Sequence, residues 1–355
     1  MFSGDGAEFI YEPCGKGRMV LAAPDGSIYC GRRYRVYRSA DRGETWRFVT
    51  EMPSGLPRRL ISSFRLGGRL LRQEVRALAV MSGGGLVAAN RRGVYFADAG
   101  EPVMRPSRLE LPRDASIAPP MTLTVGPSET IVWGEYKSAK NHGLPIRVYA
   151  STDRGRSFHI AWETRPGDIR HVHNMIFDPA SGCYWLLAGD HGDEPGIGRL
   201  STDFTSFEWV VKGQQRYRAT DLFDLGDHFV YGTDTEKEAN AVMSLEKKSG
   251  RVEKVCETDG SCIYSCRFGG IFALTTSVEP SEVNRGQYAG LWISRDGHEW
   301  RRVLQAKKDL WHPTYFQFGS LILPRGASQD DTIYFSGQAL EGMDGRIYRA
   351  HVGKA

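Results

Sequence analysis

The 355-residue chain lacks the features that mark several large protein classes. No apolar run approaches the ~18 residues that cross a membrane as a helix, so a helical membrane protein is excluded. The segment Met1–Phe9 has neither a basic stretch nor an apolar core typical of a secretion signal. We therefore expect a cytoplasmic protein; if a signal was trimmed from this sequence, the protein is extracellular or periplasmic.

Cysteine is sparse, with six residues, and its spacing matches neither Cys-x-x-Cys pairs nor a zinc ribbon. Cys256, Cys262 and Cys266 lie close together in the sequence, which leaves a metal or redox role open. We expect ordinary reduced thiols instead. The glycine run Gly83–Gly85 is followed by neither a Lys-Ser/Thr pair nor a helix pattern, so it predicts a turn and not a phosphate loop.

An excess of one charge sign is also lacking, since 46 Lys and Arg balance 42 Asp and Glu for a net charge of +4. The basic residues are mostly arginine, which binds carboxylates through a planar fork of donors. This balance does not demand a polyanionic partner. We expect no nucleic acid and no membrane as partner, and the sequence sets no expectation for the oligomeric state.

Glycine and aromatic residues are plentiful, with 41 Gly and 16 Phe, 15 Tyr and 8 Trp. This composition favours many short strands that are joined by tight turns. A short motif also recurs along the chain. Its clearest copies are SADRGETW (39–46), STDRGRSF (151–158), SRDGHEW (294–300) and the degraded STDFTSFEW (201–209).

The repeated pattern Ser-x-Asp-x-Gly-x-Thr-Trp resembles the Asp-box, or BNR repeat, of sialidase-like β-propellers. The Asp carboxylate can accept backbone N–H groups across a turn in which Gly takes a positive φ. The resemblance implies that each box joins the third and fourth strands of a blade, on the face away from the ligand. Four aspartates are therefore expected to be structural: Asp41, Asp153, Asp203 and Asp296.

With these boxes as markers, the chain divides into repeated strand–loop–strand units that alternate and are rich in β-branched and aromatic residues. The sequence predicts an all-β, seven-bladed β-propeller that forms one domain over residues 1–355, with almost no helix. A six-bladed ring is the alternative, because three repeats lack a box. We expect Glu8–Glu12 to supply the missing strand of the last blade, which removes an exposed edge. The units span 27–39, 86–97, 130–151, 184–201, 228–245, 271–294 and 332–350.

The loops between second and third strands, and the connections into each next blade, should meet at one face of the ring and form a concave site. Arginines on one side suit an anion, while histidines and carboxylates on the other can supply acid–base chemistry. The substrate-binding candidates are Arg32, Arg76, Arg91, Glu135, Asp190, Glu194, Asp234, Tyr264 and Tyr315.

The fourth repeat is the most distinctive, because His171 and His173 are brought beside the loop after its second strand by a predicted hairpin. Three interpretations stay open. The imidazoles and carboxylates could bind a divalent metal, with His173, Asp190 and His191 as candidate ligands. They could form a general base with a charge-neutralising partner, or they could be packed residues of the rim. The sequence requires no cofactor.

Tyr217 and Arg218 open the next repeat, and a Tyr–Arg pair beside histidines is similar to propeller-fold polysaccharide lyases. That resemblance implies an enzyme that acts on an acidic, uronate-containing oligosaccharide or polysaccharide by β-elimination. An Arg or His would neutralise the uronate carboxylate, and a Tyr or His would take the C5 proton and protonate the leaving oxygen. The catalytic candidates are His171, His173, His191, Tyr217 and Arg218.

Other functions remain alternatives. A sialidase would need an N-terminal Arg-Ile-Pro and a Tyr–Glu nucleophile pair; the first is missing, and Glu135 and Tyr136 are adjacent and would point to opposite faces of a strand. A glycoside hydrolase that uses two carboxylates of the rim stays open. A non-catalytic scaffold or a lectin-like glycan binder would not need histidines gathered at the rim.

Overall fold

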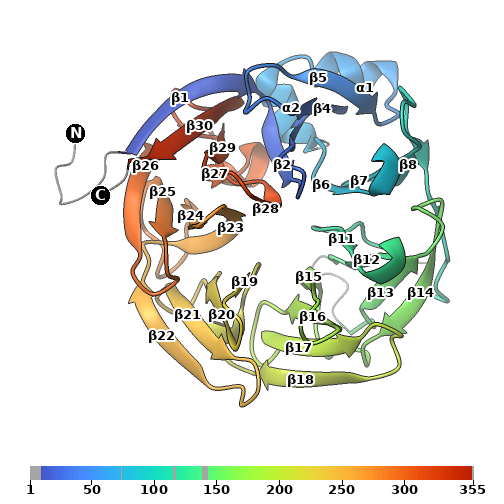
Figure 1. The fold of residues 1–355 in the computed structure, drawn as a ribbon, viewed down its shortest axis with the longest axis vertical. Coiled ribbons are helices and arrows are strands. Elements are labelled where there is room, and N and C mark those ends of the chain that lie inside the picture. Colours follow the sequence, from blue (N-terminus) through green and yellow to red (C-terminus); the bar gives the residue numbers. More distant parts are fainter. Residues whose placement is uncertain (1–8, 73, 115–116, 138–142, 354–355) are drawn as a thin grey trace.

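The computed structural model describes residues 9–72, 74–114, 117–137 and 143–353. Strands dominate this part of the chain, and they form antiparallel sheets arranged as a ring about a central axis (Figure 1). The expectation of an all-β propeller is confirmed. Strands in the interior of a blade, such as the second strand β29 (Ile333–Gln338), are buried along their whole length because neighbouring sheets cover both faces. Outer strands such as β22 (Val252–Glu257) are half exposed.

Five sheets stand as separate blades of four or five strands. The first is β6 (Ala77–Val80), β7 (Leu86–Asn90), β8 (Gly93–Ala97) and β9 (Arg105–Pro106). The second is β11 (Thr124–Val125), β12 (Ile131–Gly134), β13 (Arg147–Ser151) and β14 (Ser157–Glu163), with β10 (Arg108–Leu109) at its edge. The third is β15 (Val172–Asp178), β16 (Cys183–Ala188), β17 (Gly196–Ser201) and β18 (Phe207–Lys212), and the fourth is β19 (Phe223–Asp224), β20 (His228–Gly232), β21 (Ala241–Glu246) and β22. The fifth is β27 (Ser320–Ile322), β29, β30 (Arg346–Val352) and β1 (Phe9–Lys16).

The sixth sheet has nine strands, so the expectation of seven separate blades is corrected. A short strand, β28 (Arg325–Ser328), pairs in parallel with the inner strands of two four-stranded antiparallel runs and joins them. No repeat of the sequence predicts this strand, because it follows the inner strand β27 as an extra segment. The two runs are β2 (Arg18–Ala22), β3 (Ile28–Arg32), β4 (Arg35–Ser39) and β5 (Arg47–Glu51), and β23 (Ser261–Phe268), β24 (Ile271–Ser277), β25 (Tyr288–Ser294) and β26 (Arg301–Lys307).

The two ends of the chain close the ring. Strand β1 pairs antiparallel with β30, from Phe9 opposite Val352 to Lys16 opposite Arg346. The prediction that the N-terminal segment supplies the outer strand of the last blade is confirmed, although Glu8 itself lies outside the described residues. This pairing satisfies the edge of β30, which would otherwise be open.

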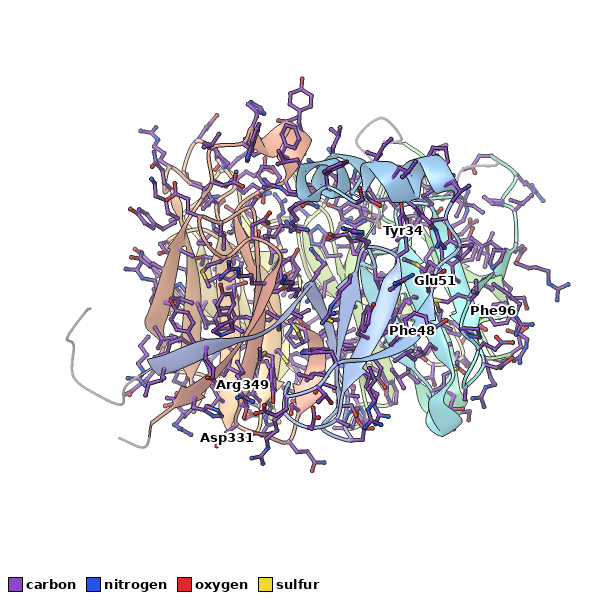
Figure 2. The ribbon with its side chains drawn as sticks, turned by 90° about the horizontal axis from the view of Figure 1, so that it is seen from above. Tyr34, Phe48, Glu51, Phe96, Asp331 and Arg349 are labelled. Atoms are coloured by element: carbon purple, nitrogen blue, oxygen red, sulfur yellow. The ribbon has the colours of Figure 1, made fainter. Side chains whose placement is uncertain are left out.

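Three short helices were not predicted from the sequence, and two of them lie together on one face of the ring. α1 (Leu56–Ile61) and α2 (Arg65–Leu71) lie between β5 and β6, and α3 (Pro313–Phe316) precedes β27. Figure 2 shows α1 and α2 together on one side of the ring. The buried Arg69 fastens α2 to α3, because its guanidinium binds Asp309 and the Phe316 carbonyl. Among the described residues, no helix has the length and apolarity to cross a membrane.

The four repeated turns, which we call the aspartate turns, connect the two outer strands of four blades: β4–β5, β13–β14, β17–β18 and β25–β26. In the second turn, Asp153 Oδ1 accepts the backbone N–H of Ser157 at 2.9 Å and Oδ2 accepts the Ser157 hydroxyl at 2.6 Å. Gly155 takes φ +81° there. Arg349 contacts Glu44 in the first turn, and it lies toward the face opposite α1 and α2 (Figure 2).

All six cysteines are free thiols. Burial raises the pKa of Cys30 and of Cys262 to about 12, so both stay protonated near neutral pH. Cys256, Cys262 and Cys266 do not form a group with metal-ligand spacing within the described part of the chain.

Candidate functional site

A cavity of about 230 Å³ lies where the inner strands converge. Its wall includes Arg72 and Gln317, which directly follow α2 and α3, so it lies toward the face that carries the helices. Its polar lining is dominated by arginine and acid–base groups from the whole ring. These are Arg18, Arg72, Glu74, Arg76, Arg91, Tyr136, His173, Arg218, Asp234, Tyr264, Glu279, Gln317, Arg325 and Gln338.

Four of the arginines have no ion pair with a carboxylate among the described residues: Arg18, Arg72, Arg76 and Arg91. Arg72 donates to the backbone carbonyls of Pro313 and Thr314. Arg18 Nη1 donates instead to Gln338 Oε1 at 2.8 Å, and the Arg76 guanidinium lies 5.2 Å from the centre of the Tyr136 ring. Burial lowers the pKa of Arg76 to about 10, and the nearby charges of Arg91 and Arg18 act in the same direction. A cluster of unneutralised guanidiniums in a cavity is a binding site for an anion.

Tyr264 on β23 is the cavity tyrosine that ionises most readily. Arg18 Nη2 donates to its hydroxyl at 3.1 Å, and the Arg325 guanidinium lies 5.8 Å from its ring centre. Burial opposes ionisation, but the positive charges of Arg18, Arg325 and Arg76 outweigh it and lower the pKa of Tyr264. Tyr136 differs, because burial and the charge of Asp190 raise its pKa.

His171, His173 and Asp190 form a tight group beside the cavity. The two Nε2 atoms are 3.0 Å apart, and Asp190 lies 3.1 Å from His171 Nε2 and 3.0 Å from His173 Nε2. Burial lowers the pKa of His171. Burial opposes ionisation of Asp190 too, but its contacts with the two imidazoles outweigh this and hold its pKa well below the ordinary value. The sequence predicted that these histidines meet His191; the structure places Asp190, the residue before it, against them.

Arg218 links this group to the acidic part of the cavity. Its Nη2 lies 3.1 Å from Asp190, 3.3 Å from Asp234 and 3.7 Å from Glu236. Its Nε and Nη1 are buried and have no hydrogen-bond partner. Burial and the charge of Asp234 raise the pKa of Glu279 to about 8, so Glu279 holds a proton at neutral pH.

Among the predicted catalytic residues, the structure does not bring His191 or Tyr217 into this group. His191 follows Asp190 but neither joins the cluster nor lines the cavity. Tyr217 packs in an apolar cluster with Trp185 and Tyr231 between two blades. The next residue, Arg218, lines the central cavity instead.

Four predicted substrate-binding residues also lie outside the cavity wall. Glu135 is fully buried beside Lys137 and Arg147, and Glu194 pairs with Arg170 at 2.9 Å. Arg32 donates to the Lys16 carbonyl and lines a separate cavity next to α1 and α2, and Tyr315 on α3 is 60% exposed. The remaining five substrate-binding candidates line the cavity or join the histidine group: Arg76, Arg91, Asp190, Asp234 and Tyr264.

Sequence reasoning missed Arg18 and Arg325. Arg18 begins an inner strand, and the repeats were aligned on their second and third strands. A search for polar residues at the first position of each inner strand would have found it. Arg325 lies on the unpredicted β28, so no repeat pattern could indicate it.

No family model matches the chain, and no curated protein matches it. Solved structures do resemble it. Virginiamycin B lyase from Staphylococcus aureus is 13% identical with a TM-score of 0.58, over 97% of this chain and 99% of that one. The GH74 xyloglucanase from Xanthomonas campestris is 12% identical with a TM-score of 0.56, over 93% of this chain and 52% of that one. These similarities support a propeller fold that enzymes also use. At this sequence identity they do not indicate a substrate for this chain.

Proposed function

We propose that this protein is a carbohydrate-active enzyme that binds an acidic, uronate-containing oligosaccharide or polysaccharide in the central cavity and cleaves it by β-elimination. The observation that carries the proposal is the set of guanidiniums without carboxylate partners among the described residues, Arg18, Arg72, Arg76 and Arg91. They line one cavity with Tyr264, whose pKa is lowered by Arg18, Arg325 and Arg76. A purely structural rim would leave no reason to collect uncompensated positive charge around a cavity.

The chemistry follows from these groups. Guanidiniums that bind the uronate carboxylate neutralise it, which makes the adjacent C5–H more acidic. The Tyr264 phenolate then takes the C5 proton, the C4–O bond breaks, and a C4–C5 double bond forms. The same proton can pass from Tyr264 to the departing glycosidic oxygen, so the step is balanced without water or an oxidant. The sequence predicts Tyr264 as a substrate-binding residue and Tyr217 or a histidine as the base; in this proposal Tyr264 is the base.

Hydrolysis is the second candidate, and Glu279 favours it. A carboxyl whose pKa is raised to about 8 is protonated at neutral pH and can act as a general acid. Asp190 or Asp234 would then serve as the partner carboxylate.

A screen against acidic polysaccharides separates these functions. Ultraviolet absorbance of an unsaturated product together with new reducing ends supports the lyase, and reducing ends alone support the hydrolase. Binding without cleavage would indicate a lectin-like protein, and neither binding nor cleavage would favour a scaffold. With a cleaved substrate in hand, Arg76→Gln should raise KM about 10- to 100-fold, because one charge-assisted hydrogen bond contributes about 1.5–3 kcal/mol. Arg47→Ala, on the exposed outer strand β5, is the matched control.

We also propose that the ring is one seven-bladed domain of the Asp-box type, over residues 1–355. Seven successive pairs of second and third strands support this count once the nine-stranded sheet is divided at β28. The hydrogen bonds of the aspartate turns support the resemblance to Asp-box propellers. An experimental density map that shows fewer four-stranded runs would overturn the count.

A further inference from the structure

We propose that His171, His173 and Asp190 bind one divalent transition-metal ion at the edge of the central cavity. Each residue directs one ligand atom toward the others, and these atoms all lie within 4.8 Å of one another. The set differs from the one suggested by sequence, because His171 takes the place of His191. Metal binding by this group does not depend on the proposed lyase activity.

The first argument is the orientation of the imidazoles. His171 Nδ1 lies 3.1 Å from the Lys137 carbonyl oxygen, and His173 Nδ1 lies 3.0 Å from the Ala219 carbonyl oxygen. A carbonyl oxygen only accepts hydrogen bonds, so both Nδ1 atoms must carry the proton. In the neutral form of each ring, Nε2 is then the nitrogen without a proton, and it faces the other two residues of the group. Backbone carbonyls on the far nitrogen orient metal-binding histidines in this way.

The second argument is electrostatic. If both rings are neutral, two Nε2 lone pairs face each other at 3.0 Å, and they face Asp190 Oδ2 at 3.1 Å from His171 and Oδ1 at 3.0 Å from His173. Three acceptors in mutual contact repel one another unless a cation lies among them. A proton on Nε2 or a metal ion can meet this need, and the experiment below distinguishes them.

The charges around this group favour an additional cation. Arg218 is the cation nearest to Asp190, and it is shared with Asp234 and Glu236. The carboxylates in this corner therefore outnumber the guanidinium. A divalent ion would balance that excess, while Tyr136, stacked on His171 with 4.1 Å between ring centres, shields the other side of that ring.

The geometry and donor set limit the kind of ion. Metal–nitrogen and metal–oxygen bonds of about 2.0–2.2 Å let one ion contact all three atoms of a triangle this small, from a position outside its plane. Two imidazoles and one carboxylate on one face of the ion suit zinc, manganese or iron(II) and leave further positions open. His173 lines the cavity, so we expect those positions to face it.

The test uses the full-length protein, purified without chelator and analysed by elemental mass spectrometry, followed by calorimetric titration of the chelator-treated protein with Zn²⁺, Mn²⁺ and Co²⁺. We expect about one ion per chain, a visible Co²⁺ spectrum and a metal-dependent rise in Tm. His173→Ala should weaken binding at least about 100-fold, since even losing an outer partner of a ligand costs 10- to 100-fold. His159→Ala, which removes an exposed histidine on β14, should bind like the parent.

His171→Gln is a second variant that keeps a side chain of similar volume in case His173→Ala does not fold, and circular dichroism reports folding for both. A folded parent protein that binds none of these ions and shows no Tm shift would overturn the proposal. Nitrogen-15 spectra recorded at neutral pH with an excess of metal ion would also overturn it if they showed His171 or His173 as an imidazolium. The cation between the three groups would then be a proton on Nε2 and not a metal ion.

Discussion

The aspartate turns and the central cavity use the same side chain in opposite ways. Asp153 sits in a turn where Ser151, Ser157 and a backbone N–H within four residues satisfy it. Asp190 is satisfied by His171, His173 and Arg218, which come from other strands and from the next blade. Both carboxyl groups have a lowered pKa, but one results from local sequence and the other from assembly of the ring.

This difference teaches which residues a repeat can reveal. A turn repeats because each blade needs the same local hydrogen bonds. The cavity residues differ from blade to blade because each supplies a different part of one asymmetric site. We therefore expect substitutions in the cavity to change activity, or to change stability through lost contacts between blades. Substitutions in the aspartate turns should change stability alone.

Tyr264→Phe is the substitution for which we expect the largest effect. It removes the hydroxyl that would carry the proton and should lower kcat about 10²- to 10⁴-fold on the polysaccharide identified in the screen. Steady-state kinetics and circular dichroism would measure this loss in folded protein. Tyr288→Phe, which alters a half-exposed tyrosine of β25, is the control. Full activity of the Tyr264→Phe protein would exclude this residue as the base.

Asp190→Asn should lower the free energy of unfolding by about 3–5 kcal/mol, because it leaves Arg218 and the paired histidines without their shared charge. Urea unfolding would measure the difference. The folded pKa of Asp190 is lowered, so its stabilisation is present above the unfolded value of about 3.9 and is lost as the pH falls below it. The gap between variant and parent should therefore shrink below about pH 4; a gap that is constant with pH would contradict the electrostatic account.

Asp153→Ala should cost about 1–3 kcal/mol of stability through lost turn hydrogen bonds. Because the aspartate turns lie away from the cavity, turnover per folded molecule should stay at the parent value. Thermal unfolding and an activity assay corrected for folded fraction would check both points. An inactive but folded Asp153→Ala protein would break the distinction between turn and cavity.

Glu279→Gln should have an effect that depends on pH and is smallest near about pH 4. The folded pKa of about 8 lies above the unfolded value of about 4.3, so the parent loses stability as the pH rises between these values. Glutamine cannot ionise, so the variant should gain on the parent from pH 4 to pH 8 in urea-unfolding midpoints. If the urea-unfolding midpoints of the two proteins changed with pH in the same way, the pKa of Glu279 would not be raised by folding.

The sequence by itself determined the local elements of this protein. Alternating apolar residues, glycine turns and the Ser-x-Asp motif predicted strands, turns and a propeller, because these depend on neighbours within a few residues. The segment Glu8–Glu12 predicted the closing strand. The grouping of His171 and His173 with Asp190 was also predictable, since one hairpin brings them together.

Only the tertiary structure decided the rest. β28 joins two blades through long-range parallel pairing, which leaves no local pattern, and it places Arg325 beside Tyr264. Tyr217 and Arg218 are adjacent, yet one packs between blades and the other faces the cavity. Arg18 and Tyr264 meet across 246 residues. These contacts form only when the ring closes, because closure brings the first residues of different inner strands around one cavity. There their charges act on one another.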